Sequence, residues 1–494
     1  MTTPTPELYW RSATELAAGL EAGELSSAEL TEAIIRRCDE VEPHIGAFLQ
    51  RTDERSLQEA EAADARRSTG VALAPWDGVP VAYKDIFVTR DVPTTAGSRI
   101  LEGWVPPYDA TVVERCTAAG MPLLGKTNLD QFAMGSSTEH SGFHPSGNPW
   151  DPARVPGGSS GGSAALVAAG GVPWAWGTDT GGSVRQPASL CGIVGVKPTY
   201  GVVSRYGMVA FASSLDQAGP LTRTVADAAA LLSTVAGHDP RDSTSIPGGA
   251  PNLLEGIEDG IAGKRIGVVK EFGGEGSQPG VRARINEAYA RLEGLGAALE
   301  EVSLPSFEHA IPAYYLIAPA EASSNLARYD GVRYGPRREA ADIVAMNSKT
   351  RADCFGAEVK RRIMIGTYAL SAGYYEAYYG KAQKVRTLII EDLERAHTQV
   401  DLIVCPTSPT TAFKLGERTA DPLSMYLSDV YTVPVNLAGV PAMSVPCGTS
   451  PDDGLPVGLQ IIAPVLDERS MFRAAYAFEQ DLGWVGSDEG RPNL

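Results

Sequence analysis

The spacing of apolar residues changes along the chain, and the changes predict an α/β fold. Three N-terminal stretches place apolar side chains at helical spacing among charged ones, which predicts helices, the last of them solvated. They cover residues 14–23, 26–41 with Ser26 or Ser27 as the cap, and 51–67. From Gly78 to Gly249 short apolar runs alternate with Gly, Ser and Pro clusters. That pattern is typical of buried strands and the helices that cross between them.

The second half of the chain continues this pattern. Residues 264–305 predict strand, amphipathic helix and strand, which is one further crossover unit. Between about Ala310 and Val400 the pattern is helical and rich in Tyr and Arg, and apolar runs at 400–410 and 443–464 predict strands that return to the sheet. We therefore expect one domain over residues 1–494, with residues 310–400 as a helical insertion or cap within it.

Composition narrows the classes of function. The formal net charge of -18 disfavours a protein that itself neutralises a nucleic-acid backbone. The N-terminus has no targeting pattern and no apolar run reaches the ~18 residues of a membrane span, so we expect a cytoplasmic protein. The six cysteines form no C-x-x-C pair, which predicts free buried thiols and no metal site.

Two Gly/Ser segments are the candidates for chemistry. Residues 155–171 resemble a phosphate cradle only loosely, because the G-K-[ST] ending is absent, and a structural turn is the plainer alternative. In residues 177–192, Ser183 follows two glycines. A nucleophilic serine needs backbone N–H groups directed at the developing oxyanion, and glycines let a carbonyl group come close. The candidate donors are Thr180, Gly181, Gly182 and Ser183 itself.

A nucleophilic serine also needs a base. His140 and His144 lie in a polar loop and give only weak support for a Ser-His-Asp triad, and they lack a third metal ligand. Lys84 is the alternative base, because it interrupts an apolar strand-like run, although a structural lysine at a strand end is an open alternative. The adjacent Asp85 need not neutralise it, since successive strand side chains point to opposite faces.

Taken together, three segments resemble the signature motifs of the amidase signature family. They are GVPVAYKD, GGSSGGS and DTGGSVRQP, and the resemblance extends from about Glu15 to Phe478. It implies an α/β fold with one mixed, largely parallel sheet covered by helices on both faces. It also implies a Ser-Ser-Lys triad in which Ser183 is the nucleophile, Ser159 bridges from a cis peptide and Lys84 is the base.

The C-terminal half resembles one branch of that family, the A-type subunits of bacterial tRNA-dependent amidotransferases. The resemblance implies a glutaminase that passes ammonia to a partner for amidation of Glu-tRNA(Gln) or Asp-tRNA(Asn). It implies Tyr314, Arg362 and Asp429 as glutamine-binding residues. Because Tyr315 and Arg361 are adjacent residues of the same types, a motif match shifted by one position is the alternative. A solvated helix face is the other explanation for Arg362.

The same resemblance implies that the protein assembles as a heterotrimer. The partners would be a B-type kinase subunit, which binds most of the tRNA, and a small C-type subunit. We expect no cofactor in this chain, because ATP and Mg²⁺ would belong to the B-type partner. Two alternatives remain open at this point: a stand-alone amidase that acts on another small amide, and a catalytically idle scaffold.

Overall fold

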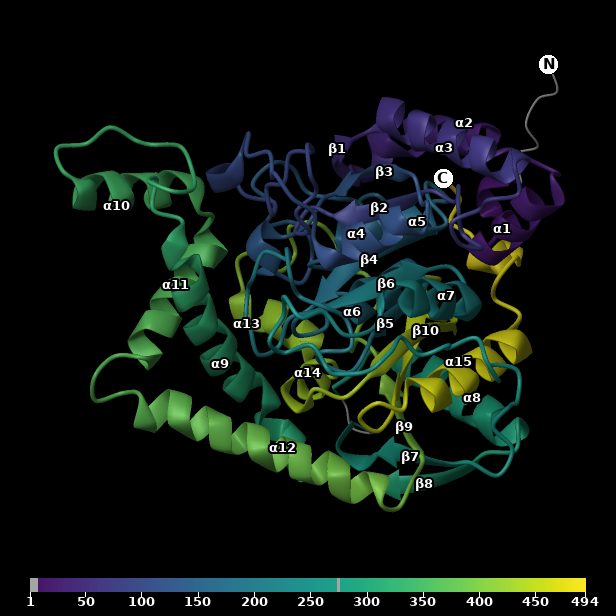
Figure 1. The fold of residues 1–494 in the computed structure, drawn as a ribbon. Coiled ribbons are helices and arrows are strands. Elements are labelled where there is room, and N and C mark those ends of the chain that lie inside the picture. Colours follow the sequence, from purple (N-terminus) through teal and green to yellow (C-terminus); the bar gives the residue numbers. More distant parts are fainter. Residues whose placement is uncertain (1–7, 273–275) are drawn as a thin grey trace.

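The computed structural model describes residues 8–272 and 276–494. Their strands form a single mixed sheet with helices packed around it (Figure 1). The strands are β1 (Phe48–Arg51), β2 (Val81–Lys84), β3 (Leu123–Thr127), β4 (Trp174–Asp179), β5 (Val194–Lys197), β6 (Gln217–Thr222), β7 (Arg265–Val269), β8 (Ala298–Val302), β9 (Leu402–Pro406), β10 (Ala442–Thr449) and β11 (Pro456–Ile462). Their order across the 11-stranded sheet is β1-β3-β2-β4-β6-β5-β10-β11-β9-β7-β8.

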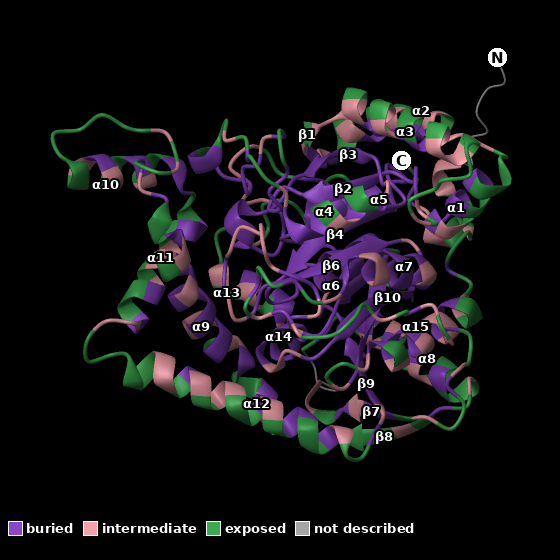
Figure 2. Cartoon of the chain, viewed as in Figure 1, coloured by how far each residue is buried: buried purple, intermediate pink, exposed green. Residues whose placement is uncertain are grey.

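Helices cover both faces of this sheet. They are α1 (Ala13–Ala22), α2 (Ser27–Ile45), α3 (Asp53–Ser68), α4 (Thr111–Ala118), α5 (Gly161–Ala168), α6 (Arg185–Cys191), α7 (Val225–Val235), α8 (Pro279–Gly294), α9 (Ala310–Asn325), α10 (Ile343–Cys354), α11 (Ala357–Ala369), α12 (Lys381–His397), α13 (Pro422–Tyr426), α14 (Val433–Ala438) and α15 (Glu468–Leu482). Every residue of β2, β4, β5 and β6 is buried (Figure 2). Since successive strand side chains point to opposite faces, such strands must be covered on both.

The sheet confirms the predicted α/β class, but its pairing is less parallel than expected. The pairs β2–β3, β2–β4, β7–β8 and β7–β9 are parallel. Across the middle the pairs β4–β6, β5–β6, β5–β10, β10–β11 and β9–β11 are antiparallel. One reason is a tight reversal: β10 and β11 follow each other directly and pair as a hairpin, whereas parallel neighbours need a longer crossover.

The predicted N-terminal helices are confirmed as α1, α2 and α3. Ser26 rather than Ser27 caps α2: its Oγ accepts from the Glu29 amide at 3.1 Å, and the Glu29 carboxylate accepts from the Ser26 amide at 2.9 Å. This reciprocal capping box satisfies two helix-end donors. All six cysteines are free and buried, as predicted. None of the helices in residues 8–272 and 276–494 combines the length and apolar character of a bilayer span.

Helical structure also fills most of the stretch between Ala310 and Val400, as α9 to α12. In Figure 1, α9, α10 and α11 lie to the left of the sheet and α12 runs below it, with α10 projecting furthest. Strand β9 then re-enters the sheet between β11 and β7. The view of this stretch as an insertion within one domain stays a prediction.

Two central strands bring the three signature segments together. Strands β2 and β4 are parallel neighbours, with Tyr83 opposite Trp176. Parallel neighbours end at the same edge of a sheet, so Lys84 at the end of β2 lies next to Thr178 near the end of β4. The Gly/Ser loop before α5 crosses the same edge, where Ser160 also contacts Thr178. The topology thus places the candidate residues in one location.

Candidate active site

Lys84 is buried against the Gly/Ser loop. Its Nζ lies 2.7 Å from Ser159 Oγ, 2.9 Å from Ser160 Oγ and 2.9 Å from Thr178 Oγ1. Its side chain forms no ion pair with any residue the structure describes. Burial lowers the pKa of Lys84 to about 7, although the negative charges of Asp130, Asp179 and Asp216 act to raise it. A large fraction of the amine is therefore neutral near pH 7 and able to accept a proton.

The carboxylate next in sequence to Lys84 is held by another lysine. Asp85 Oδ1 accepts from Lys126 Nζ at 2.9 Å, and Asp85 Oδ2 accepts from the Thr95 amide at 2.8 Å. Lys126 Nζ also donates to the Phe87 carbonyl at 2.8 Å. This arrangement agrees with the expectation that Asp85 does not neutralise Lys84, because both carboxylate oxygens of Asp85 bind donors other than Lys84.

The loop that carries Ser159 is fixed by a glutamine from α6. The peptide bond between Gly158 and Ser159 is cis, so it precedes Ser159. The Gly158 amide donates to Gln186 Oε1 at 3.0 Å, and Gln186 Nε2 donates to the Ser136 carbonyl at 3.0 Å. Gln186 therefore joins three segments: the loop that carries Ser159, the start of α6 and the earlier loop that contains Ser136.

The turn that carries Ser183 is organised by a buried ion pair. Asp179 accepts from Arg185 Nε at 3.0 Å and from Nη2 at 2.9 Å, and both side chains are fully buried. Asp179 also accepts from the amides of Gly182 at 2.9 Å and Val184 at 3.2 Å. Although burial alone would raise the pKa of Asp179, the charge and hydrogen bonds of Arg185, with a hydrogen bond from Asn436, hold it well below the usual range. The carboxylate thus fixes the backbone on both sides of Ser183.

One expected oxyanion donor is already occupied. The Gly182 amide donates to Asp179, so the structure does not leave it free for a substrate oxygen. The amides of Thr180, Gly181 and Ser183 have no acceptor among the described residues. Glycine is required at position 182 by the backbone conformation. Its φ is 138°, which strains residues with a side chain, and a Cβ there would collide with Thr432 Oγ1.

Ser183 lies beside the Gly/Ser loop and is 7% exposed. Its carbonyl accepts from the Ser160 amide at 3.1 Å. Its hydroxyl has no hydrogen bond to a side chain within the described residues, so the structure joins Lys84 to Ser159 but leaves Ser159 and Ser183 unlinked. Neither His140 nor His144 contacts it there, which removes support for a histidine base.

Of the two neighbouring tyrosines on α9, Tyr314 faces the Ser183 turn. A Cβ built on Gly181 would lie 2.7 Å from the Tyr314 hydroxyl. Tyr315 instead stacks on Tyr426, with ring centroids 3.8 Å apart. Burial raises the pKa of Tyr314, so its hydroxyl stays a proton donor at neutral pH.

Asp429 presents a carboxylate oxygen without a partner. It lies in the 3-10 turn η8 (Leu427–Asp429), and its Oδ2 accepts from the Ser136 hydroxyl at 2.5 Å. Its Oδ1 is buried, has no hydrogen bond within the described residues, and would lie 3.3 Å from a Cβ on Gly182. Burial raises the pKa of Asp429 to about 7, although Ser136 and the charge of Arg362 lower it. A cationic group at this position would complete its coordination.

Arg362 on α11 is buried, which excludes the solvated-face interpretation. Its side chain is 3% exposed, compared with 40% for Arg361. Its Nε donates to Glu358 Oε1 at 2.7 Å, and its guanidinium lies 5.2 Å from the Tyr315 ring centroid. The two terminal nitrogens of Arg362 make no hydrogen bond within the described residues. They are therefore available for a carboxylate.

The sequence left several supporting residues unassigned. Asp179 and Arg185 lie in the same signature segment as Ser183, so their motif could have identified them. Glu358, Tyr426 and Ser136 gave no such signal. Tyr426 and Ser136 lie far along the chain from their partners, and the pairing of Glu358 with Arg362 four residues later resembles any helical ion pair. Only the folded arrangement shows what they hold.

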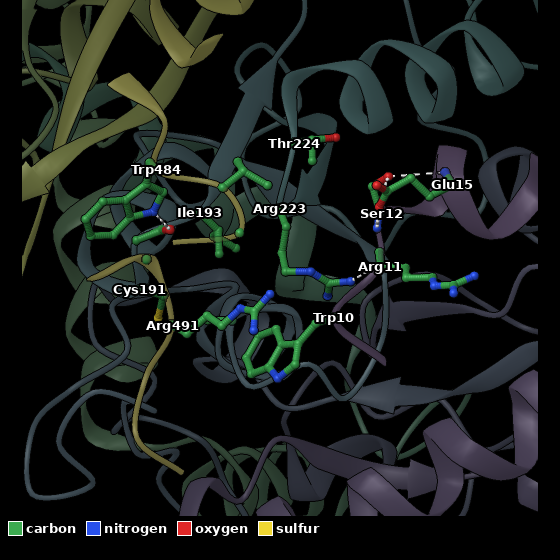
Figure 3. Close-up of a pocket in the computed structure, with 15 residues that line it drawn as sticks. Trp10, Arg11, Ser12, Glu15, Cys191, Ile193, Arg223, Thr224, Trp484 and Arg491 are labelled. Carbon is green, nitrogen blue, oxygen red and sulfur yellow. Dashed lines mark hydrogen bonds between the residues drawn. The ribbon is translucent and has the colours of Figure 1, made fainter. Parts of the chain in front are cut away.

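A separate cavity lies away from these residues (Figure 3). It has a volume of about 350 Å³ and is lined by side chains that include Trp10, Arg223, Trp484 and Arg491. Arg223 donates to the carbonyls of Arg11, Val167 and Val172. Its guanidinium thus serves to join backbone segments, and none of the residues around Ser183 lines this cavity.

Comparison with known proteins adds an independent line of evidence. The family model described as Amidase matches residues 29–472. The chain is 60% identical to the A subunit of glutamyl-tRNA(Gln) amidotransferase from Acidothermus cellulolyticus, over 96% of this chain and 94% of that protein. It is similar to the solved structure of the corresponding A subunit from Thermotoga maritima, with 45% identity, a TM-score of 0.79, and 96% and 95% of the two chains covered. It also resembles a peptide amidase from Stenotrophomonas maltophilia, with 31% identity, a TM-score of 0.81, and coverage of 96% and 97%.

The geometry around Lys84 predicts a pH dependence for the reactivity of Ser183. If neutral Lys84 is the base, acylation of Ser183 should rise with pH through about 7 and level off above it, because deprotonation produces the active form. The rate constant for labelling by an acylating reagent, measured from pH 5 to 9 with peptide mapping, tests this in roughly the range where the amine titrates.

The matched comparison uses Lys84→Ala, which should label at least about a hundredfold more slowly and without the rising limb. Asp429 also titrates near neutral pH, so Asp429→Asn is measured in parallel and should keep the limb. A limb that persists in Lys84→Ala would assign the base elsewhere.

Proposed function

The chain belongs to the amidase family, and we propose that it is the glutamine-hydrolysing subunit of a tRNA-dependent amidotransferase. One observation carries the choice of substrate: Asp429 Oδ1 lacks a partner among the described residues, and Arg362 has free terminal nitrogens there. A free α-amino acid carries both an ammonium and a carboxylate, which complement these two groups. An amide without those charges would leave both unsatisfied.

In the proposed reaction, glutamine binds with its carboxylate at Arg362 and its ammonium at Asp429. Tyr314 contacts the bound substrate next to Gly181. The binding of the ammonium replaces a missing partner of Asp429, so it should lower the pKa of that carboxyl and stabilise its charged form. The side-chain amide of glutamine then extends toward Ser183, which lies on the same turn as Gly181.

The chemistry uses Ser183, Ser159 and Lys84 as a Ser-Ser-Lys triad. Neutral Lys84 takes a proton from Ser159 while Ser159 takes one from Ser183, after the Ser183 hydroxyl rotates toward Ser159. The Ser183 Oγ attacks the amide carbon, and the oxyanion is stabilised by backbone amides of the turn that Asp179 does not occupy. The relay returns a proton to the nitrogen, ammonia leaves, and a γ-glutamyl ester remains on Ser183 until water hydrolyses it.

The second half of the reaction belongs to partner subunits. A B-type subunit would hold ATP and Mg²⁺, activate the acid of Glu-tRNA(Gln) or Asp-tRNA(Asn) by phosphoryl transfer, and receive the ammonia. A small C-type subunit completes the heterotrimer. The net charge of -18 suits a subunit that leaves most tRNA contacts to its partner. The whole assembly is then a ligase, and the chain itself is a serine amidase.

The division of labour predicts a specific rescue. In the assembled complex, Ser183→Ala should abolish glutamine-dependent amidation of the tRNA-bound acid, whereas added ammonium chloride should restore it. The reason is that the serine only produces ammonia, and the acceptor is activated elsewhere. Amidated tRNA measured with each nitrogen donor tests this.

The matched control is Ser68→Ala, which removes an exposed hydroxyl on α3 and should leave both activities unchanged. A stand-alone amidase would give no amidated tRNA from either donor, and an idle scaffold would be indifferent to Ser183→Ala. Loss of both activities from an intact Ser183→Ala complex would mean that Ser183 serves the acceptor chemistry.

The charged ends of the substrate predict a second effect. Arg362→Ala and Asp429→Asn should each weaken glutamine binding by roughly 2–4 kcal/mol, because each removes a charge-assisted contact and leaves the opposite group unpaired. KM for glutamine in the glutaminase reaction measures this, with Lys360→Ala on the exposed face of α11 as the control. Unchanged KM in both variants would remove Arg362 and Asp429 from the substrate site.

A further inference from the structure

Glu358 is a buried carboxylate that contacts Arg362 and the segment leading to Asp429 in the proposed glutamine pocket. It lies on the first turn of α11 and is 4% exposed. Its Oε1 accepts from Arg362 Nε at 2.7 Å and from the Tyr426 hydroxyl at 2.8 Å. Its Oε2 pairs with Arg361. A buried carboxylate with this many donors keeps its charge, and although burial acts to raise the pKa of Glu358, Arg362, Tyr426 and Arg361 hold it below the ordinary value.

The first consequence concerns the orientation of Arg362. Glu358 binds the Nε edge of the guanidinium, and the rings of Phe211, Tyr315 and Tyr426 lie within 5.5 Å of its Cζ. A planar guanidinium held along one edge and by ring faces has one remaining direction for its two terminal nitrogens. The edge that is left unpaired within the described residues is the one suited to a bidentate carboxylate contact.

The second consequence concerns the segment that carries Asp429. Tyr426 ends α13, and η8 with Asp429 follows it directly. The hydrogen bond from Tyr426 to Glu358 therefore joins this segment to α11, and the stacking of Tyr315 on Tyr426 adds α9 to the same contact. One carboxylate oxygen thus links the elements that present the two opposite charges.

The charges along this cluster also alternate. Arg361, Glu358 and Arg362 form a row with a net charge of +1. An anion at the free edge of Arg362 would extend the alternation and bring the row to neutrality. Glu358 therefore does not cancel the attraction for a carboxylate, because Arg361 offsets its charge from the other side.

We propose that Glu358 is a positioning residue that aims Arg362 at the α-carboxylate of the substrate and thereby sets the preference for a free amino acid over a simple amide. This inference rests on the proposed function, since it concerns the same pocket. Glu358 does not touch the reacting atoms. It acts through Arg362, so its loss should weaken recognition of the carboxylate and leave the acylation chemistry intact.

A purely structural role is the competing explanation, because Glu358 lies in the first turn of α11, where an acidic residue favours the helix dipole. Loss of such a role would lower stability and affect every amide substrate alike. The two explanations therefore differ in substrate discrimination. γ-Aminobutyramide, which is glutamine without its carboxylate, provides the comparison.

The experiment measures ammonia release by the assembled complex with glutamine and with γ-aminobutyramide. Glu358→Ala should raise KM for glutamine at least about tenfold, keep kcat within about threefold, and change the kinetics with γ-aminobutyramide by less than about threefold. Glu358→Gln, which keeps an acceptor oxygen for Arg362 and Tyr426, should restore KM for glutamine to within about threefold. Glu394→Ala, an exposed glutamate on α12, is the matched control and should equal the parent protein.

Several results would overturn the inference. They are an unchanged KM for glutamine in Glu358→Ala, an equal loss with both substrates, and no rescue by Glu358→Gln. Tyr426→Phe removes one hydroxyl and keeps the stacked ring, so it tests the same contact if Glu358→Ala does not assemble. It should raise KM for glutamine about threefold, and an unchanged KM would count against the inference. A parent complex without glutaminase activity would overturn the proposed function as well, so the two failures are distinguishable.

Discussion

The arrangement of this site depends on one constraint, which is that a lysine amine is buried without a carboxylate partner among the described residues. Burying a charged amine is costly, and lowering its pKa from the usual value near 10.4 to about 7 corresponds to about 5 kcal/mol. Lys84 donates to hydroxyl and carbonyl oxygens. The neutral amine is therefore favoured, and a neutral amine is what a proton relay needs.

The acidic residues near this lysine are each engaged by other donors. Asp85 binds Lys126, Asp179 binds Arg185, and Asp130 accepts from the amides of Thr138 and His140. Each of these pairings has a second effect, because it fixes a loop or turn of the site. The same contacts that keep carboxylates away from Lys84 thus hold the segments that carry the two serines. In the proposed glutamine pocket the buried cation is instead paired with a carboxylate, because Arg362 Nε donates to Glu358.

Sequence reasoning reached the class of fold and the three signature segments, because both are local signals. Apolar periodicity predicted most strands and the N-terminal helices, the glycine pattern located Ser183, and the family resemblance added Ser159. The family resemblance implied a more parallel sheet than the one observed, and apolar periodicity did not correct it because periodicity carries no strand direction. The Gly182 amide was also predicted to be a donor to the oxyanion. The sequence does not show that this amide donates to the Asp179 carboxylate instead. Glu358 was missed as well: its spacing to Arg362 is that of an ordinary helical ion pair, and its link to Tyr426, 68 positions away in the chain, appears only in the folded structure.

The most direct test of this mechanism is to identify the residue that carries the acyl group. The assembled complex is mixed with glutamine, quenched in acid during turnover, digested, and analysed by mass spectrometry for a γ-glutamyl ester. We expect the ester on Ser183, and its absence from Ser183→Ala under the same conditions. An ester on Ser159 or Ser160 would contradict the assignment of the nucleophile, and glutamine turnover without any serine ester would contradict covalent catalysis by this site.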